Sequence, residues 1–202
     1  MVQKGQFLER PTLIPSGKFT LEGLWHRGTV APSALLIPPL PGEGSMDAAA
    51  LNELAFALSR AGHPSLRFNF GGIGASQGQS KTLAAQERDA RAAAKLLRES
   101  AGFEPLAAVA FRSGANVALR LVDSATKLVL VSPPPELDLG DLATTPVETL
   151  FAIPEADPGR PRWGEHCARS GDRLALIEAA DPAWNRGLPQ LAREVVQFLD
   201  TP

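Results

Sequence analysis

Apolar and polar positions follow two different periods, in alternation, along this chain. Short runs that are apolar at nearly every position recur between segments whose apolar residues lie three or four positions apart. Strands buried on both faces produce the first pattern, and helices packed on a sheet produce the second. The strand-like runs are residues 34–37, 65–70, 106–111, 127–131, 147–153 and 174–177, and the helix-like segments are residues 45–61, 82–99, 114–122, 163–168 and 188–199. This order predicts an α/β fold, a three-layer sandwich whose mostly parallel sheet has about six to eight strands with helices on both faces.

The helical period is clearest after Ser45. Leu51 and Leu58 fall on one face of the predicted helix together with the other apolar residues of the segment. The side chain of Ser45 or Asp47 can cap the first turn, and Gly62 can end the last one. We therefore expect a helix that starts close to Ser45 and ends at Gly62.

The amino-terminal part of the chain has a different pattern. Residues 12–25 alternate loosely around Pro15, Ser16 and Gly17, which predicts an antiparallel hairpin over about residues 12–26. No internal repeat and no linker rich in proline or serine divides the chain. We expect a single domain over residues 1–202.

Composition and charge exclude several classes of function. The formal net charge is -2 at pH 7. The chain therefore lacks the excess of positive charge with which proteins bind nucleic acids and anionic membranes. Its only cysteine, Cys167, cannot form an internal disulfide, and no apolar run is long enough to span a membrane. The three histidines lie far apart in sequence, without the spacing of metal ligands. We expect a cytoplasmic protein without cofactor or metal, which neither binds nucleic acid nor inserts into a membrane.

Four segments carry a likeness to a known family. They are residues 44–47 (GSMD), 66–78 (LRFNFGGIGASQG), 115–121 (ANVALRL) and 128–134 (LVLVSPP). Together they resemble the small, lidless α/β-hydrolases close to the dienelactone-hydrolase-like esterases, and the likeness runs in order from about residue 19 to residue 199. It implies the α/β-hydrolase fold, whereas activity has to be argued from the residues of the site.

The nucleophile elbow of that family reads Gly-x-Ser-x-Gly, a sharp turn from strand to helix that presents the serine. Here the strand predicted at residues 106–111 leads into Arg112, Ser113 and Gly114, so Arg112 stands at the nucleophile position. Ser113 is the alternative nucleophile. Centring the motif on it places Phe111 two residues earlier, where a phenylalanine ring crowds the turn.

The general base of the family is a late histidine in a Gly-Ala-Asp-His pattern. This chain has AADP at residues 179–182, which places Pro182 where the base would stand. His166 is the only histidine in the last third of the chain, and it precedes the strand predicted at residues 174–177. Its simplest interpretation is a surface histidine on a short helix.

The acid position matches the pattern of the family, whereas the oxyanion-side loop does not. Asp157 follows the strand predicted at residues 147–153 and matches the acid of the family's Gly-Glu-x-Asp pattern, although a solvated loop carboxylate is the alternative. The family's oxyanion-side loop reads His-Pro-His-Pro, and this chain has PPLP at residues 38–41. The resemblance thus implies a degenerate triad at Arg112, Asp157 and Pro182.

A glycine-rich turn at Gly72, Gly74 and Gly78 also invites a dinucleotide-binding interpretation. Such a site needs the turn to open directly into a helix and an acidic residue at the end of the next strand. The next predicted strand instead ends in Phe111 and Arg112, and four polar residues, 77 and 79–81, separate the turn from the helix. We therefore expect no nucleotide cofactor.

Two hypotheses of function follow. The first is a catalytically inactive α/β-hydrolase homologue that acts as a binding or assembly subunit, since a triad works as a unit. The alternative is a carboxylic-ester or thioester hydrolase with a displaced nucleophile, Ser113 or Cys167, and His166 as base. Because side chains of adjacent residues diverge, His166 and Cys167 cannot readily serve each other.

The expected binding residues are Arg112, Asp157, Trp163 and Trp184. We expect Arg112 to form an ion pair with Asp157, or failing that with Glu155, because a cation at a helix amino terminus needs a compensating acid. Tryptophan and arginine often anchor interfaces, so the two tryptophans are predicted at a protein-binding rim. The alternative is that they fold inward as a plug. The expected partner is another protein or a small anionic or acyl ligand.

Overall fold

A computed structural model describes residues 9–140, 142 and 147–201. Its strands are β1 (Arg10–Ser16), β2 (Phe19–His26), β3 (Ser33–Ile37), β4 (Ser65–Phe68), β5 (Leu106–Phe111), β6 (Lys127–Val131), β7 (Glu148–Pro154) and β8 (Arg173–Ile177). They form one 8-stranded sheet in the order β1-β2-β4-β3-β5-β6-β7-β8. The pairs β1–β2 and β2–β4 are antiparallel, and the other neighbours are parallel. The hairpin expected at about residues 12–26 is formed by β1 and β2.

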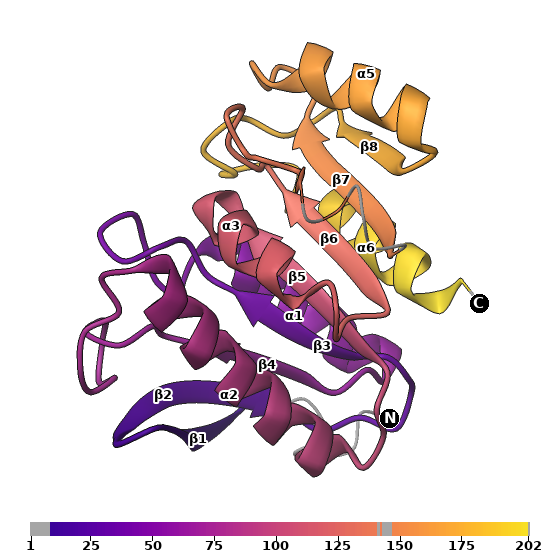
Figure 1. Cartoon of the computed structure of the whole chain (residues 1–202). Coiled ribbons are helices and arrows are strands. Elements are labelled where there is room, and N and C mark those ends of the chain that lie inside the picture. The colour runs from indigo at the N-terminus through magenta and orange to yellow at the C-terminus, as the bar shows by residue number, and fades with distance from the viewer. Residues whose placement is uncertain (1–8, 141, 143–146, 202) are drawn as a thin grey trace.

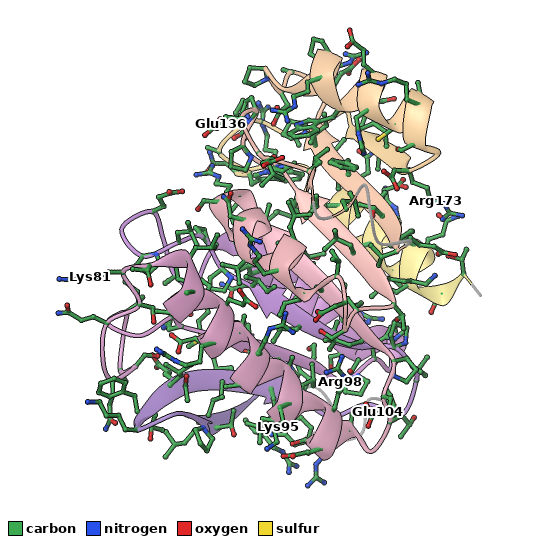
Figure 2. All side chains as sticks on the ribbon, viewed as in Figure 1. Lys81, Lys95, Arg98, Glu104, Glu136 and Arg173 are labelled. Carbon is green, nitrogen blue, oxygen red and sulfur yellow. The ribbon has the colours of Figure 1, made fainter. Side chains whose placement is uncertain are left out.

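Helices cover both faces of this sheet (Figure 1). Helices α1 (Ala49–Ala61) and α6 (Leu188–Asp200) pack on one face, and α2 (Leu83–Ala101), α3 (Ala115–Ala118) and α5 (Arg160–Ser170) pack on the other. Figure 2 shows charged side chains such as Lys81, Lys95 and Glu104 pointing outward from the periphery. The predicted three-layer α/β sandwich is confirmed.

The alternation of side chains along a strand explains why the central strands are apolar throughout. Leu35 and Ile37 of β3 belong to the core under α2 and α3, while Ala34 and Leu36 belong to the core under α1 and α6. Successive side chains point to opposite faces of a sheet, so a strand between two helical layers must be apolar on both. Every residue of β3, β5 and β6 is buried accordingly.

The predicted cap of the first helix is wrong. Helix α1 begins after Ala48, whose methyl side chain cannot accept a capping hydrogen bond. Ser45 and Asp47 are engaged in other contacts. The Ser45 hydroxyl accepts the N–H of Asp47 at 3.1 Å, and the Asp47 carboxylate pairs with Arg67 at 3.1 Å. The carboxyl end follows the prediction, since Gly62 closes α1 with a φ of 91° that favours glycine.

The helix predicted at residues 114–122 is broken into three short pieces. Tight 3₁₀ turns at Arg112–Gly114 and Leu119–Leu121 flank the four-residue helix α3.

In the described part of the chain, no helix is both long and apolar enough to cross a membrane.

The order of the sheet determines where its loops converge. The chain passes from β3 to β4 on one side of β3 and then to β5 on the other side. In open α/β sheets the crevice beyond the carboxyl ends of two such strands is the usual place for ligands. The loops after β3 and β5 therefore define the first place to look for a functional site.

Candidate functional site

A sharp turn joins β5 to α3 and presents Arg112. The residue has a φ of 51°, in the left-handed region that side chains other than glycine rarely adopt. Gly114 allows this turn to lie against the loop after β3, because a Cβ atom at Gly114 would stand 2.4 Å from the carbonyl oxygen of Pro38. The turn from strand to short helix resembles a nucleophile elbow, and the side chain at its tip is that of Arg112.

Arg112 does not form the predicted ion pair. Its Nη2 donates to the carbonyl oxygen of Pro182 at 3.0 Å, and its guanidinium lies 5.1 Å from the centre of the Phe111 ring. Within the described residues, no carboxylate oxygen lies within 4.0 Å of the guanidinium. The expected partners have nearer donors, since Asp157 Oδ1 accepts the N–H of Gly159 at 2.8 Å and Glu155 pairs with Arg160 at 3.5 Å.

Ser113 is turned toward the loop after β3. Its side chain is buried, and its Oγ accepts the backbone N–H of Leu40 at 2.9 Å. Asn116 fixes the same turn by donating from Nδ2 to the carbonyl oxygen of Ser113 at 3.0 Å. The backbone amide that borders the cleft on the β3 side is thus satisfied by a side chain of the protein itself.

Two neighbouring cavities share Arg112 as part of their walls. The first, of about 410 Å³, extends past Ser113, Ser132 and the prolines after β6 to Asp157 and Pro182. The second, of about 360 Å³, extends from Pro39 past the start of α1 to Trp184. Their other charged wall residues are the carboxylates of Glu43, Asp47, Glu136 and Asp157. Arg112 is the cation that borders both.

None of the three histidines, all of which lie in the described part of the chain, lines either cavity. His26 approaches Glu9 at 3.9 Å, and His63 is held between the carbonyl oxygen of Pro32 and the carboxylate of Asp200. His166 Nε2 bonds Asp172 at 2.8 Å, and its ring packs against Phe151. The cleft around Arg112 therefore contains no imidazole.

The alternative nucleophiles lie in separate places. Cys167 is on α5, where its thiol points at the carbonyl oxygen of Arg173 over 3.8 Å, whereas Ser113 lies between β5 and the loop after β3. Burial, with a contribution from nearby Asp172, raises the pKa of the Cys167 thiol to about 11. A protonated thiol is a poor nucleophile. The structure thus does not bring Ser113, Cys167 and His166 together.

Both tryptophans are buried. Trp163 is 0% exposed and stacks on Phe151 with the ring centres 5.2 Å apart. Trp184 is 1% exposed, and its Nε1 donates to Ser132 Oγ at 3.0 Å. The expectation of an exposed tryptophan rim is corrected here, and the alternative, in which the rings fold inward, describes their positions. Sequence reasoning did not identify Ser132, directly after β6, as the residue that holds the Trp184 ring.

Around Pro182 the loop is closed by a local turn. Asp181 Oδ1 accepts the backbone N–H groups of Ala183 at 2.9 Å and Asn185 at 3.3 Å. Although desolvation opposes the change, the hydrogen bonds from Asn185 and Ala183 lower the pKa of the Asp181 carboxyl. This turn directs the Trp184 ring inward and leaves the carbonyl group of Pro182 to meet Arg112.

The glycine-rich loop after β4 holds carboxylates of the chain itself. The N–H of Gly71 donates to Asp89 at 3.1 Å, and the N–H of Ala75 donates to Glu22 at 2.9 Å. Donors of this kind would have to bind phosphate in a dinucleotide site.

Among the described residues, no group of three or more histidine, cysteine, aspartate or glutamate side chains could hold a metal ion.

Comparison with solved structures shows the α/β-hydrolase fold. An α/β serine hydrolase homologue from Coxiella burnetii is 20% identical with a TM-score of 0.79, and the match covers 98% of this chain and 99% of that one. A serine hydrolase without a lid from Xanthomonas campestris is 22% identical with a TM-score of 0.77, over 96% of both chains. A Pyrococcus furiosus esterase is 18% identical with a TM-score of 0.80, over 98% of this chain and 95% of that one. No family model matches the sequence, and the comparison with curated proteins finds no match.

Proposed function

We infer that this protein is a non-catalytic member of the α/β-hydrolase fold class that acts by binding a ligand in the cleft around Arg112. The observation that carries the proposal is the elbow itself. It presents a guanidinium in place of a hydroxyl, and the facing loop meets it with the carbonyl oxygen of Pro182. On this proposal Arg112, Asp157 and Pro182 occupy the positions of the triad.

Two observations argue against ester hydrolysis at this cleft. A serine attacks at neutral pH only when a base within hydrogen-bond reach removes its proton, and no histidine lines either cavity. The tetrahedral intermediate also needs backbone N–H donors that are free to bind its oxyanion. The N–H of Leu40 borders the cleft but is occupied by Ser113 Oγ at 2.9 Å.

The unused donors of the Arg112 guanidinium favour a ligand that carries a carboxylate. Within the described residues only Nη2 of Arg112 forms a hydrogen bond, so the Nε and Nη1 donors remain to bind a ligand. A guanidinium binds a carboxylate through paired, charge-assisted hydrogen bonds. Because Glu43, Glu136 and Asp157 also line the larger cavity, such a ligand must place its charge at Arg112. A small acyl anion and an acidic side chain of a partner protein share this chemistry.

A carboxylic-ester or thioester hydrolase with a displaced nucleophile is the second candidate. The comparisons favour this class more directly than the non-catalytic one, because the similar solved structures include proteins named as esterases and serine hydrolases. It requires Ser113 or Cys167 to meet a base that the cleft does not contain.

Turnover of a short-chain activated ester separates the two candidates. On the main proposal, the purified chain hydrolyses the ester no faster than a heat-treated sample does, with or without a serine-reactive phosphonate. Turnover that disappears in Ser113→Ala or in Cys167→Ala would establish the second candidate and overturn the first.

Binding is tested with hexanoate and its uncharged analogue hexanamide, by titration followed with nuclear magnetic resonance. Hexanoate is expected to bind more tightly than hexanamide, and Arg112→Gln should abolish that difference. Arg169→Gln is the matched control, because Arg169 lies on α5 and lines neither cavity. Equal binding of the two compounds, or an unchanged preference in Arg112→Gln, would contradict the assignment to Arg112.

A further inference from the structure

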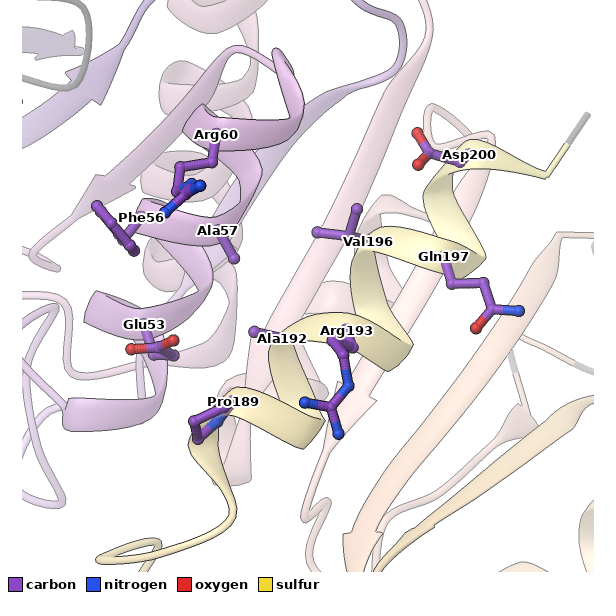
Figure 3. Close-up of a pocket in the computed structure, with 10 residues that line it drawn as sticks. All are labelled: Glu53, Phe56, Ala57, Arg60, Pro189, Ala192, Arg193, Val196, Gln197 and Asp200. Carbon is purple, nitrogen blue, oxygen red and sulfur yellow. The ribbon is translucent and has the colours of Figure 1, made fainter. Parts of the chain in front are cut away.

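Helices α1 and α6 lie side by side on one face of the sheet and form a groove on the outside of the molecule (Figure 3). The groove has a volume of about 590 Å³, and its apolar wall residues include Phe56, Ala57, Ala192 and Val196. The Phe56 side chain is 47% exposed. The residues of α1 and α6 that line this groove are called the α1–α6 face below. They lie on the outer surface of the two helices, and none of them lines the cavities at Arg112.

Charged residues border the α1–α6 face in an alternating arrangement. The two helices run in the same direction, since His63, just after α1, bonds Asp200 at the end of α6 at 3.1 Å. Figure 3 shows Glu53 and Arg193 toward the start of the two helices and Arg60 and Asp200 toward their ends. The sign therefore changes both along each helix and across the groove.

Most of these charges have no ionic partner among the residues that the structure describes. Among the described residues, Glu53, Arg60 and Arg193 form no ion pair within 4.0 Å, whereas several other surface charges do. Arg60 instead lies over the Phe56 ring, 5.8 Å from its centre. Asp200 contacts His63. Within the described part of the chain, three of the four charges are thus without an ionic partner.

We propose that the α1–α6 face is the interface of a homodimer of this chain. Two copies stacked face to face are related by a twofold axis in the plane of the interface, and each surface meets its own rotated image. An axis along the helices places Glu53 opposite Arg193 of the second copy and Arg60 opposite Asp200. An axis across the helices places Glu53 opposite Arg60 and Arg193 opposite Asp200. Opposite charges therefore face each other for either axis.

The size of the face fits a small interface. Each helix has 13 residues, hence a length of about 20 Å, and neighbouring helices lie roughly 10 Å apart. The two together present a face of about 20 by 20 Å, which is smaller than the interface of a stable complex and has the size of a weak, transient contact, so we expect a Kd in the micromolar range. A balanced, alternating charge pattern does not attract a uniformly charged partner, whereas a second copy matches it by symmetry.

Sedimentation of the full chain over a concentration series tests the proposal. The wild-type chain is expected to shift from monomer to dimer, and Phe56→Ser should raise the dimer Kd about tenfold or more. The control is Leu13→Ser on β1, because Leu13 is another large apolar side chain and is 73% exposed. It should leave the Kd unchanged. A wild-type chain that stays monomeric at millimolar concentration, or a dimer lost only in Leu13→Ser, would overturn the proposal.

Charge reversal gives an independent test. Glu53→Arg makes the face mainly positive, and the double variant Arg60→Glu with Arg193→Glu makes it wholly negative. Each variant alone should dimerise more weakly than the wild type, because at least two of its four facing pairs have like charges. An equimolar mixture should form a heterodimer, since three of four facing pairs then have opposite charges for either axis. Circular dichroism confirms that both variants are folded. If both variants dimerise alone as the wild type does, the α1–α6 face is not the interface.

Discussion

At the scale of single residues, Arg112 and Ser113 have adjacent positions but separate contacts. Arg112 reaches across the cleft to the carbonyl oxygen of Pro182, and Ser113 turns back to the N–H of Leu40. Replacing only the first of them does not supply a base or release the Leu40 amide.

We therefore expect Arg112→Ser to gain no esterase activity. A serine without a base keeps its proton, and a triad that lacks one member loses most of its rate. Turnover of an activated ester by Arg112→Ser should stay within about twofold of Arg112→Ala, which has the same cleft without a hydroxyl. A large gain in Arg112→Ser alone would reveal a base that the histidine positions do not account for.

Cys167 should behave as an unreactive thiol in the folded protein. Its pKa rises from 9.0 to about 11, so the reactive thiolate forms only when the pH approaches 11. At pH 8 the thiolate fraction should be about a hundredfold lower than in the unfolded chain. Mass spectrometry of iodoacetamide labelling against pH, with and without denaturant, measures this difference. Equal labelling rates in the two states at pH 8 would contradict it.

The residues of the elbow could be read from the sequence, but their partners could not. The apolar strand before Arg112 and the glycine after it predict a turn at this point, and Arg112 is the residue that the turn presents. The expected ion pair with Asp157 failed for a local reason: the nearest donor to that carboxylate is the N–H of Gly159, two residues away. Such short-range hydrogen bonds depend on loop conformation, which hydrophobic patterning does not encode.

At the scale of elements, the loop between β8 and α6 is fixed to the sheet by Trp184. Its ring is 1% exposed, joins the core under α1 and α6, and bonds Ser132. The loop thereby closes one side of the second cavity beside Arg112.

Trp184→Ala should lower the free energy of unfolding by about 3–5 kcal/mol, because the ring leaves a large cavity behind. Trp184→Phe is the matched variant. It keeps most of the apolar volume but loses the bond to Ser132, and should cost about 1 kcal/mol beyond the loss of ring volume. Urea unfolding curves measure both values. A loss below about 1 kcal/mol in Trp184→Ala would mean that the ring does not stabilise the fold.

The strands were predictable because burial on both faces leaves an unbroken apolar run. Residues 106–111 and 127–131 match β5 and β6 at both ends. Helix starts were less predictable, as α1 shows: two good capping residues precede it, yet both are used in other contacts. For Trp163 and Trp184 the sequence left both a protein-binding rim and an inward plug open, because both stand in polar segments, where sequence neighbours do not reveal a tertiary contact.

At the scale of the whole molecule, both cores share the same central strands. Leu35 and Leu36 are consecutive residues of β3, yet they belong to cores on opposite faces of the sheet. Loss of either helical layer exposes one side of every central strand.

The chain should accordingly unfold in one cooperative transition, as expected for a single domain. In differential scanning calorimetry the calorimetric and van't Hoff enthalpies should agree, and near- and far-ultraviolet circular dichroism should give the same midpoint. Two resolved transitions would show that one part of the sheet unfolds independently, and would contradict the single domain predicted for residues 1–202.

The left-handed turn at Arg112 also makes residue 112 a suitable position for attaching other side chains. Because the main chain holds residue 112 with a φ of 51°, the direction in which its side chain leaves the turn depends little on which side chain it is. Unbranched L-residues such as arginine, cysteine and serine face a broadly similar steric cost there, whereas β-branched residues face a larger one, so exchanges among the unbranched residues leave that cost nearly unchanged. A fluorophore attached to a cysteine at residue 112 would stand between the two cavities, while buried Cys167 stays unlabelled. The elbow thus offers an optical reporter position for whatever enters the cleft.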